Sequence, residues 1–197
     1  RFPVGGMTQS AVGRIARENG LETAEKKDST GVCFIGERNF KRFLMQFLPA
    51  QPGDMVDPSG AVVGRHDGLM YYTLGQRRGL GIGGRGDGRS WFVVGKDLQC
   101  NRLLVCQGED DPRLYSNCVF ASNVSFIRGQ APGEEFDCTA KVRYRQQDQA
   151  CRVKMEGDSA RVFFEEKQRA VTPGQSVVFY QGPVCLGGGI IERAEMS

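Results

Sequence analysis

The second half of the chain is a series of short β-type runs separated by turn residues. From about Tyr115 onward the runs follow one another at regular intervals, and this spacing is typical of a sandwich or a small closed barrel. We therefore expect a mainly β protein that ends in a C-terminal antiparallel β-barrel. The six runs are CVFASNVSF, FDCTAKVRY, CRVKM, ARVFF, SVVFY and PVCLGGGII.

The first half mixes helical and β-type patterns. Residues 8–20, TQSAVGRIARENG, begin with a threonine suited to an N-cap and stop at Asn-Gly, and residues 39–48, NFKRFLMQFL, carry apolar side chains at helical spacing. Beyond Pro52, the turn sequences DPSG and KDLQ each separate two β-type runs, as EGD does further along, and predict hairpins. These patterns predict a small central α+β domain, with a boundary to the barrel within residues 108–116.

Composition places the chain among ordinary globular proteins. It has 197 residues, of which 40% are hydrophobic and 25% charged. No apolar run approaches the roughly 20 residues that span a bilayer, and the start lacks a signal-peptide pattern, so we expect a cytoplasmic protein without a membrane partner. The net charge of +3 permits a nucleic-acid partner but does not by itself indicate one.

The cysteines and the histidine limit the kinds of site. Seven cysteines form no CxxC pair, and with a single histidine, His66, a structural metal and a disulfide scaffold are both disfavoured. This composition suits a reduced setting in which most thiols pack as small hydrophobic groups. Six of the cysteines lie within or beside β-type runs that are expected to bury them, namely Cys100, Cys106, Cys118, Cys138, Cys151 and Cys185.

Cys33 is different because it follows a Ser-Thr-Gly turn in the polar segment DSTGVC. A reactive thiol needs partial exposure and a stabilised thiolate, to which loop amides, Lys26 or Lys27 can contribute. An inert packed thiol is the commoner case for any one cysteine. His66 is the only candidate base for a protease-like pair and is interpreted as structural. Chemistry that uses the sulfur itself, as a carrier or a redox partner, therefore fits Cys33 better.

The segment RGLGIGG contains Gly79-x-Gly81-x-x-Gly84, the formal pattern of a dinucleotide loop. A dinucleotide loop must leave a strand and open a helix, whereas RGDGRS and a β-type run follow here, so a turning loop is favoured. Four arginines around this loop are candidates for phosphate contacts, although a solvated basic loop is the commoner explanation. They are Arg77, Arg78, Arg85 and Arg89.

The segment KVRYRQ is the second candidate for contacts with RNA. Read as a strand, it places Lys141, Arg143 and Arg145 on one face and Val142 and Tyr144 on the other. Arginines beside an exposed tyrosine suit RNA, because phosphates and a stacked base can both be held. The pattern alone favours the alternative, a solvated polar face with Tyr144 in the core.

Five segments of the sequence, taken in order, resemble the tRNA-specific 2-thiouridylase family. The resemblance covers nearly the whole chain. Enzymes of this family begin with an ATP-pyrophosphatase domain that carries an SGGVDS-type phosphate loop and a first catalytic cysteine, and this chain has neither. The resemblance therefore implies the end of the nucleotide-binding domain with the cysteine loop (1–36), a central α+β domain (37–110) and the β-barrel (111–197). The segments are KKDSTGVCFIGE, FLPAQPGDMVD, GRHDGLMYYTLGQRRGLGIGG, KVRYRQ and AVTPGQSVVFYQGPVCLGGGII.

The resemblance also implies a chemistry. ATP adenylates the C2 oxygen of the wobble uridine in the tRNA anticodon, and sulfur then replaces that oxygen. Cys33 matches the second catalytic cysteine, which accepts sulfur as a persulfide from a carrier protein and can form a disulfide with the first. ATP, with Mg²⁺ as a candidate companion, is held by the domain that this chain lacks, so the chain alone is expected to be inactive and to hold no cofactor and no metal.

Three further residues match the family. Arg143 and Tyr144 match barrel residues that the family uses against tRNA, and Gln175, in TPGQS, matches another tRNA contact. The resemblance thus reverses the preference drawn from the pattern alone. Two alternatives stay open: a stand-alone RNA-binding β-barrel module with a structural Cys33, and a thiol redox or hydrolytic enzyme built around that cysteine.

Overall fold

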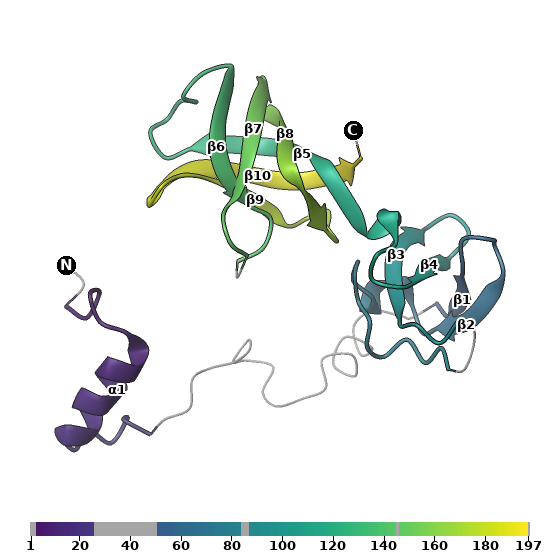
Figure 1. Ribbon diagram of the computed structural model, residues 1–197, viewed down its shortest axis with the longest axis horizontal. Coiled ribbons are helices and arrows are strands. Elements are labelled where there is room, and N and C mark those ends of the chain that lie inside the picture. The colour runs from purple at the N-terminus through teal and green to yellow at the C-terminus, as the bar shows by residue number, and fades with distance from the viewer. Residues whose placement is uncertain (1–2, 26–50, 84–86, 145, 197) are drawn as a thin grey trace. The chain divides into compact units, whose positions relative to one another are not determined.

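The computed structural model describes residues 3–25, 51–83, 87–144 and 146–196 (Figure 1). The chain divides into two compact units, Arg1–Pro49 and Ala50–Ser197. Within the described ranges no helix is both long enough and apolar enough to cross a membrane. The three domain ranges expected from the resemblance stay a prediction.

The first unit contains α1, Gln9–Glu18, which confirms the helix predicted near the start. Thr8 is the N-cap, and its hydroxyl oxygen accepts a hydrogen bond from the amide of Ala11 at 3.3 Å. Gly20 has a φ of +63°, which suits the end of a helix because glycine carries no Cβ. The second predicted helix, residues 39–48, lies outside the described residues.

The second unit begins with a four-stranded mixed sheet in the order β2-β1-β4-β3. Strand β1 pairs antiparallel with β2 and parallel with β4, while β3 and β4 are antiparallel. The hairpins predicted around DPSG and KDLQ are therefore confirmed. The strands are β1 (Gly53–Val56), β2 (Val62–His66), β3 (Trp91–Asp97) and β4 (Arg102–Gln107), and a 3-10 turn, η1 (Leu69–Tyr71), follows β2.

A closed six-stranded barrel follows, in the order β10-β5-β8-β7-β6-β9, with every neighbouring pair antiparallel. It confirms the mainly β fold with a C-terminal barrel. A 3-10 turn, η2 (Pro112–Leu114), precedes it. The strands are β5 (Tyr115–Phe126), β6 (Glu135–Lys141), β7 (Gln149–Glu156), β8 (Ser159–Arg169), β9 (Ser176–Gln181) and β10 (Val184–Glu195).

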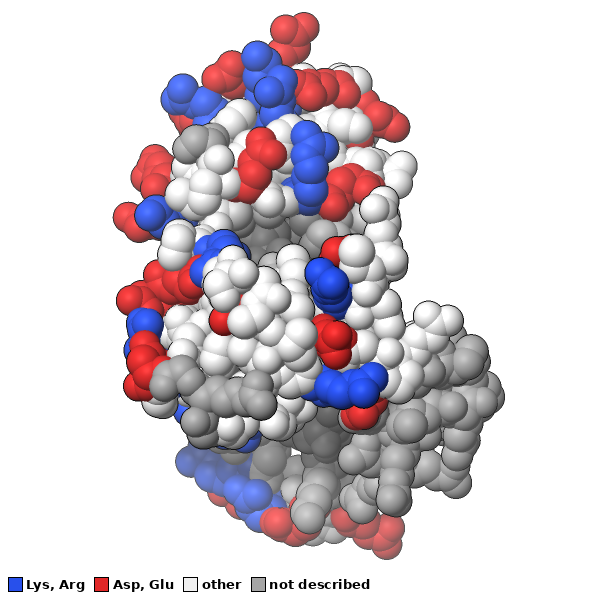
Figure 2. Space-filling model, turned by 90° about the vertical axis from the view of Figure 1, so that its right-hand side faces the viewer, with Lys and Arg blue, Asp and Glu red and all other residues white. Residues whose placement is uncertain are grey.

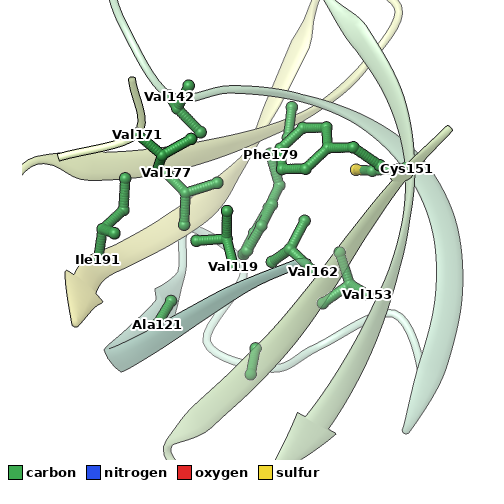
Figure 3. Close-up of a cluster of buried hydrophobic side chains, with 13 residues drawn as sticks. Val119, Ala121, Val142, Cys151, Val153, Val162, Val171, Val177, Phe179 and Ile191 are labelled. Atoms are coloured by element: carbon green, nitrogen blue, oxygen red, sulfur yellow. The ribbon is translucent and has the colours of Figure 1, made fainter. Parts of the chain in front are cut away.

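The barrel interior is filled by apolar side chains from all six strands (Figure 3). Phe179 is fully buried and contacts two half-buried rings, stacking on Phe126 and meeting Phe136 edge to face. The glycines of β10 allow the strand to lie close to its neighbours. A Cβ on Gly187 would lie 2.1 Å from the carbonyl oxygen of Ser125, so any larger residue there would push the strands apart.

The sheet and the barrel touch within the second unit at the end of β8. The amide of Ala170 donates to the carbonyl of Leu114 at 2.6 Å, and the guanidinium of Arg169 lies 5.0 Å from the ring centre of Phe92. Gly75 leaves room for this approach, because a Cβ there would lie 2.5 Å from the Cβ of Ala170. The backbone at Ala170 is thereby fixed, which matters for the candidate site.

Candidate nucleic-acid interface

Strand β6 ends at Lys141, so the strand predicted to run through KVRYRQ stops earlier than expected. The amide of Val142 donates to the side-chain oxygen of Gln146 at 3.1 Å, and the amide of Gln146 donates to the carbonyl of Arg143 at 3.1 Å. These bonds replace strand pairing and form a turn. The predicted alternation of faces is wrong beyond Lys141, and Arg145 lies outside the described residues.

The turn is anchored at its base by hydrogen bonds between two glutamine side chains. The Gln146 amide nitrogen donates to the side-chain oxygen of Gln168, which is 98% buried, and Gln168 donates to the carbonyl of Glu166 at 2.8 Å. An ion pair of 2.8 Å between Lys141 and Asp148 joins the two sides of the turn. Because buried amides are costly to leave unpaired, these hydrogen bonds stabilise the base of the turn.

Tyr144 points outward from this turn. Its side chain is 94% exposed, so the alternative of a core tyrosine is wrong. An aromatic ring in full contact with water, on an anchored backbone, is ready to stack on a nucleobase, and such stacking is worth about 1–3 kcal/mol per base. Figure 1 shows the β6–β7 connection extending beyond the strands at the end of the barrel where β8 also ends.

Arg143, also exposed, reaches from the turn to the start of the β8–β9 connection. Its guanidinium donates to the carbonyl of Ala170 at 2.8 Å, and the hydroxyl of Thr172 donates to the same oxygen at 3.1 Å. Ala170 adopts a φ of +51°, which directs the chain into this connection. A guanidinium has five N–H donors, so Arg143 keeps donors for a phosphate while one bond fixes its position.

Gln175 lies in the same β8–β9 connection, five residues after Ala170. Its backbone is held on both sides: its carbonyl accepts from the amide of Ile191 at 2.7 Å, and its amide donates to the carbonyl of Thr172 at 3.2 Å. The residue itself is exposed. The contact between Arg143 and Ala170 therefore joins the two connections that carry Arg143, Tyr144 and Gln175, and makes them one candidate surface at one end of the barrel.

The glycine-rich loop differs from the sequence-based picture in one respect. Arg89 is held by two carboxylates, Asp87 at 2.6 Å and Asp110 at 3.2 Å. The amide and guanidinium of Arg89 hold the pKa of the Asp87 carboxyl below its usual range, which keeps the pair charged. Arg77 and Arg78 are exposed on this loop, while Gly84 and Arg85 lie outside the described residues.

The described part of this loop offers no nucleotide site of the dinucleotide type. Residues 77–83 lead, across the undescribed residues 84–86, to strand β3 and not to a helix. A hollow of about 460 Å³ is lined by Arg77 and by the loop glycines.

On the face drawn in Figure 2, acidic and basic side chains lie interspersed, and no large patch of one sign is visible there.

His66 is structural, as expected. It is 99% buried, its Nδ1 accepts from the amide of Gly68 at 3.1 Å, and its Nε2 lies 3.0 Å from the carbonyl oxygen of Asn101. These partners require the proton on Nε2, so both nitrogens are satisfied within the fold. Among the described residues no group of three or more histidine, cysteine, aspartate or glutamate side chains is placed to hold a metal ion.

Cys33, with Lys26 and Lys27, lies outside the described residues, so its role stays a prediction. The expectation of burial for the other six cysteines holds in part. Cys106, Cys118 and Cys151 are buried and Cys138 and Cys185 are half-buried, but Cys100 is exposed because it occupies the turn between β3 and β4. Burial raises the pKa of Cys106 to about 11 and also raises that of Cys118, which keeps both thiols protonated and unreactive.

Three family profiles match consecutive parts of the chain. They are the tRNA methyl transferase HUP domain over residues 1–37, the tRNA methyl transferase PRC-barrel domain over residues 41–107 and the aminomethyltransferase beta-barrel domain over residues 116–191. Proteins named tRNA-specific 2-thiouridylase MnmA are 60% identical in Bacillus subtilis and 61% identical in Bacillus licheniformis, in each case over 97% of this chain. The Hahella chejuensis protein of the same name is 58% identical over 97% of the chain.

The chain therefore belongs to the tRNA-specific 2-thiouridylase family, as its sequence motifs indicated. It covers 52% of the two Bacillus proteins and 53% of the Hahella protein, which is about half the length of these relatives.

Proposed function

We propose that this chain supplies the tRNA-contact surface and the sulfur-carrying cysteine of a tRNA-uridine 2-sulfurtransferase. The observation that carries the proposal is Tyr144, fully exposed on an anchored turn beside Arg143 and joined through Ala170 to the connection that holds Gln175. Membership of a family whose relatives are named tRNA-specific 2-thiouridylases supports tRNA as the ligand.

In this proposal the barrel end positions the anticodon region of the tRNA. The remaining guanidinium donors of Arg143 bind a phosphate and fix the register of the strand, while the Tyr144 ring stacks on an unpaired base. The side-chain amide of Gln175 adds a neutral hydrogen-bonding group on the same surface. The wobble uridine, presented in this way, reaches a sulfur carried by Cys33 as a persulfide that a carrier protein delivers.

ATP binding is assigned to a part of the protein outside this chain. The described residues contain no glycine-rich loop that opens a helix, so they do not fit a nucleotide phosphate site, and no step of the proposal uses one. When bound, ATP would supply activation of the C2 oxygen of the uridine. The chain alone should bind tRNA and transfer no sulfur.

The thiolation part is tested in cells whose only full-length gene carries Cys33→Ser. We expect 2-thiouridine to disappear from tRNA while the protein level is unchanged, because serine cannot carry sulfane sulfur. Cys118→Ser is the matched control, since this thiol is buried and its raised pKa keeps it inert.

A second candidate, a stand-alone RNA-binding barrel, is favoured by one observation: the three candidate contact residues, Arg143, Tyr144 and Gln175, all lie in connections of the barrel. Normal 2-thiouridine in the Cys33→Ser strain, together with tRNA binding by the chain, would support this candidate and contradict the sulfur-carrying role.

A further inference from the structure

Two cysteines face each other inside the barrel, at the base of the turn that carries Tyr144. Cys138 of β6 and Cys151 of β7 are direct partners in the strand register, and their sulfur atoms lie 3.6 Å apart. Both are free thiols. Figure 3 shows Cys151 among the core side chains.

The backbone geometry suits a bond between these two residues. A disulfide requires a Cα–Cα distance of roughly 4.4–6.8 Å, and directly opposed residues of an antiparallel pair lie about 4.5 or 5.5 Å apart. Bond formation brings the sulfur atoms from their separation of 3.6 Å to about 2.05 Å. The strands can therefore stay in register while the bond forms.

The two thiols are not equivalent. The hydrogen bond from the Cys151 thiol lowers the pKa of Cys138, and the same bond, with burial, raises the pKa of Cys151. Cys138 is also the more exposed of the two, and both residues are among those that line a hollow of about 610 Å³. Cys138 is thus the thiol that acts as the nucleophile toward an external disulfide.

We propose that Cys138 and Cys151 form a reversible dithiol–disulfide site whose oxidant is a small-molecule disulfide. The Cys138 thiolate attacks one sulfur of the disulfide and releases one thiolate, which takes up a proton. The Cys151 sulfur then loses its proton, attacks the Cys138 sulfur of the mixed disulfide and releases the second thiolate. The two cysteines are oxidised, and the small disulfide is reduced to two thiols.

The bond closes a loop that contains the whole β6–β7 turn. A cross-link between paired strands changes the folded state little and acts mainly by restricting the unfolded chain, so the linked form should melt about 5 °C or more above the reduced form. Tyr144 should keep its exposure, because the turn is already fixed by Gln146 and Gln168. The bond should therefore stabilise the barrel beneath the contact turn under oxidising conditions without changing the turn itself.

The test equilibrates the chain with mixtures of oxidised and reduced glutathione, traps free thiols by alkylation and maps peptides by mass spectrometry without reduction. We expect a peptide pair joined through Cys138 and Cys151, lighter by two hydrogens and separated again by dithiothreitol. The control Cys118→Ser should form the same pair. Separate alkylation of both cysteines in the most oxidising mixture would overturn the proposal.

Two variants test the order of attack. Cys151→Ser should leave a stable glutathione adduct on Cys138, whereas Cys138→Ser should leave Cys151 unmodified in the folded chain, because Cys151 is 4% exposed. The reverse pattern would overturn the assignment of Cys138 as the attacking thiol.

The purpose given to the bond rests on the proposed function, so tRNA affinity is measured on both forms. We expect the linked and reduced chains to bind tRNA within about twofold of each other. A large loss on linking would show that the bond changes the contact turn and would overturn this part of the proposal. A chain that links but binds no tRNA in either form contradicts only the proposed function, and one that binds tRNA but never links contradicts only the dithiol site.

Discussion

The β6–β7 turn and the glycine-rich loop are both rich in arginine in the sequence, yet the structure gives them different properties. In the turn, the hydrogen bonds of Gln146 and Gln168 stabilise the backbone and Tyr144 is left free in water. In the loop, Arg89 is neutralised by Asp87 and Asp110. The comparison teaches that the side chains left exposed by the fold, and not the number of cations in the sequence, single out the turn as the candidate surface.

The first prediction concerns the hydrogen bond between Gln146 and Gln168 that anchors the turn. Gln168→Leu removes the partner of the Gln146 amide inside the barrel, which should lower the free energy of unfolding by about 1–3 kcal/mol. The loosened turn should also weaken tRNA binding severalfold. Denaturant unfolding and anisotropy with labelled tRNA measure the two effects, with the exposed neighbour change Lys167→Ala as control. Unchanged stability would mean that this hydrogen bond does not hold the turn.

The second prediction concerns the exposed arginines of the glycine-rich loop, Arg77 and Arg78. If Arg77 and Arg78 each contact a phosphate, the double change to alanine should reduce the slope of log affinity against log salt by about 1.4, since each contact with single-stranded RNA contributes about 0.7. Affinity should fall severalfold at physiological salt. An unchanged slope would remove this loop from the tRNA surface and leave the barrel end alone.

The third prediction has the smallest expected effect. Arg89→Ala should leave the salt dependence of tRNA binding unchanged, because the guanidinium is already paired with two carboxylates. The free energy of unfolding should change little, because ion pairs between exposed side chains contribute little to stability. If the slope of log affinity against log salt fell by about 0.7, as for one phosphate contact, Arg89 would have to leave its carboxylate partners when RNA binds.

The barrel was predictable because its signal is local. Alternating apolar residues and turn sequences such as EGD recur at short intervals, and each run became one strand. The first helix was predictable for the same reason, from Thr8 and the Asn-Gly stop. The glycines of β10 are evident in the sequence, but the reason for them is not. In the structure a Cβ on Gly187 or Gly188 would lie 2.1 or 2.4 Å from a carbonyl oxygen of the neighbouring strand.

The features that escaped prediction depend on partners distant in the sequence or on side chains that compete with the backbone. The strand through KVRYRQ ends early because the Gln146 side chain takes the amide of Val142. The second partner of the Gln146 side chain, Gln168, is 22 residues away in the sequence. A glutamine within a polar run gives almost no indication that it is buried. Asp110, which neutralises Arg89, is likewise 21 residues distant.

The link between the β6–β7 and β8–β9 connections could not be predicted from the sequence either. It depends on the carbonyl of Ala170, a residue whose left-handed backbone nothing in its side chain indicates. The functional assignment of Arg143, Tyr144 and Gln175 came from the family resemblance, since the pattern alone favoured a tyrosine in the core.

The most direct test of the account is the affinity of the chain for tRNA when Tyr144→Ala is compared with Ile127→Ala. Ile127 is 73% exposed in the β5–β6 connection, at the opposite end of β6, so its change removes a comparable exposed apolar group away from the candidate surface. The account predicts that Tyr144→Ala weakens binding by about 5- to 150-fold, that Tyr144→Phe restores most of it, and that Ile127→Ala has no effect. Equal affinity for the Tyr144→Ala and Ile127→Ala chains would contradict it.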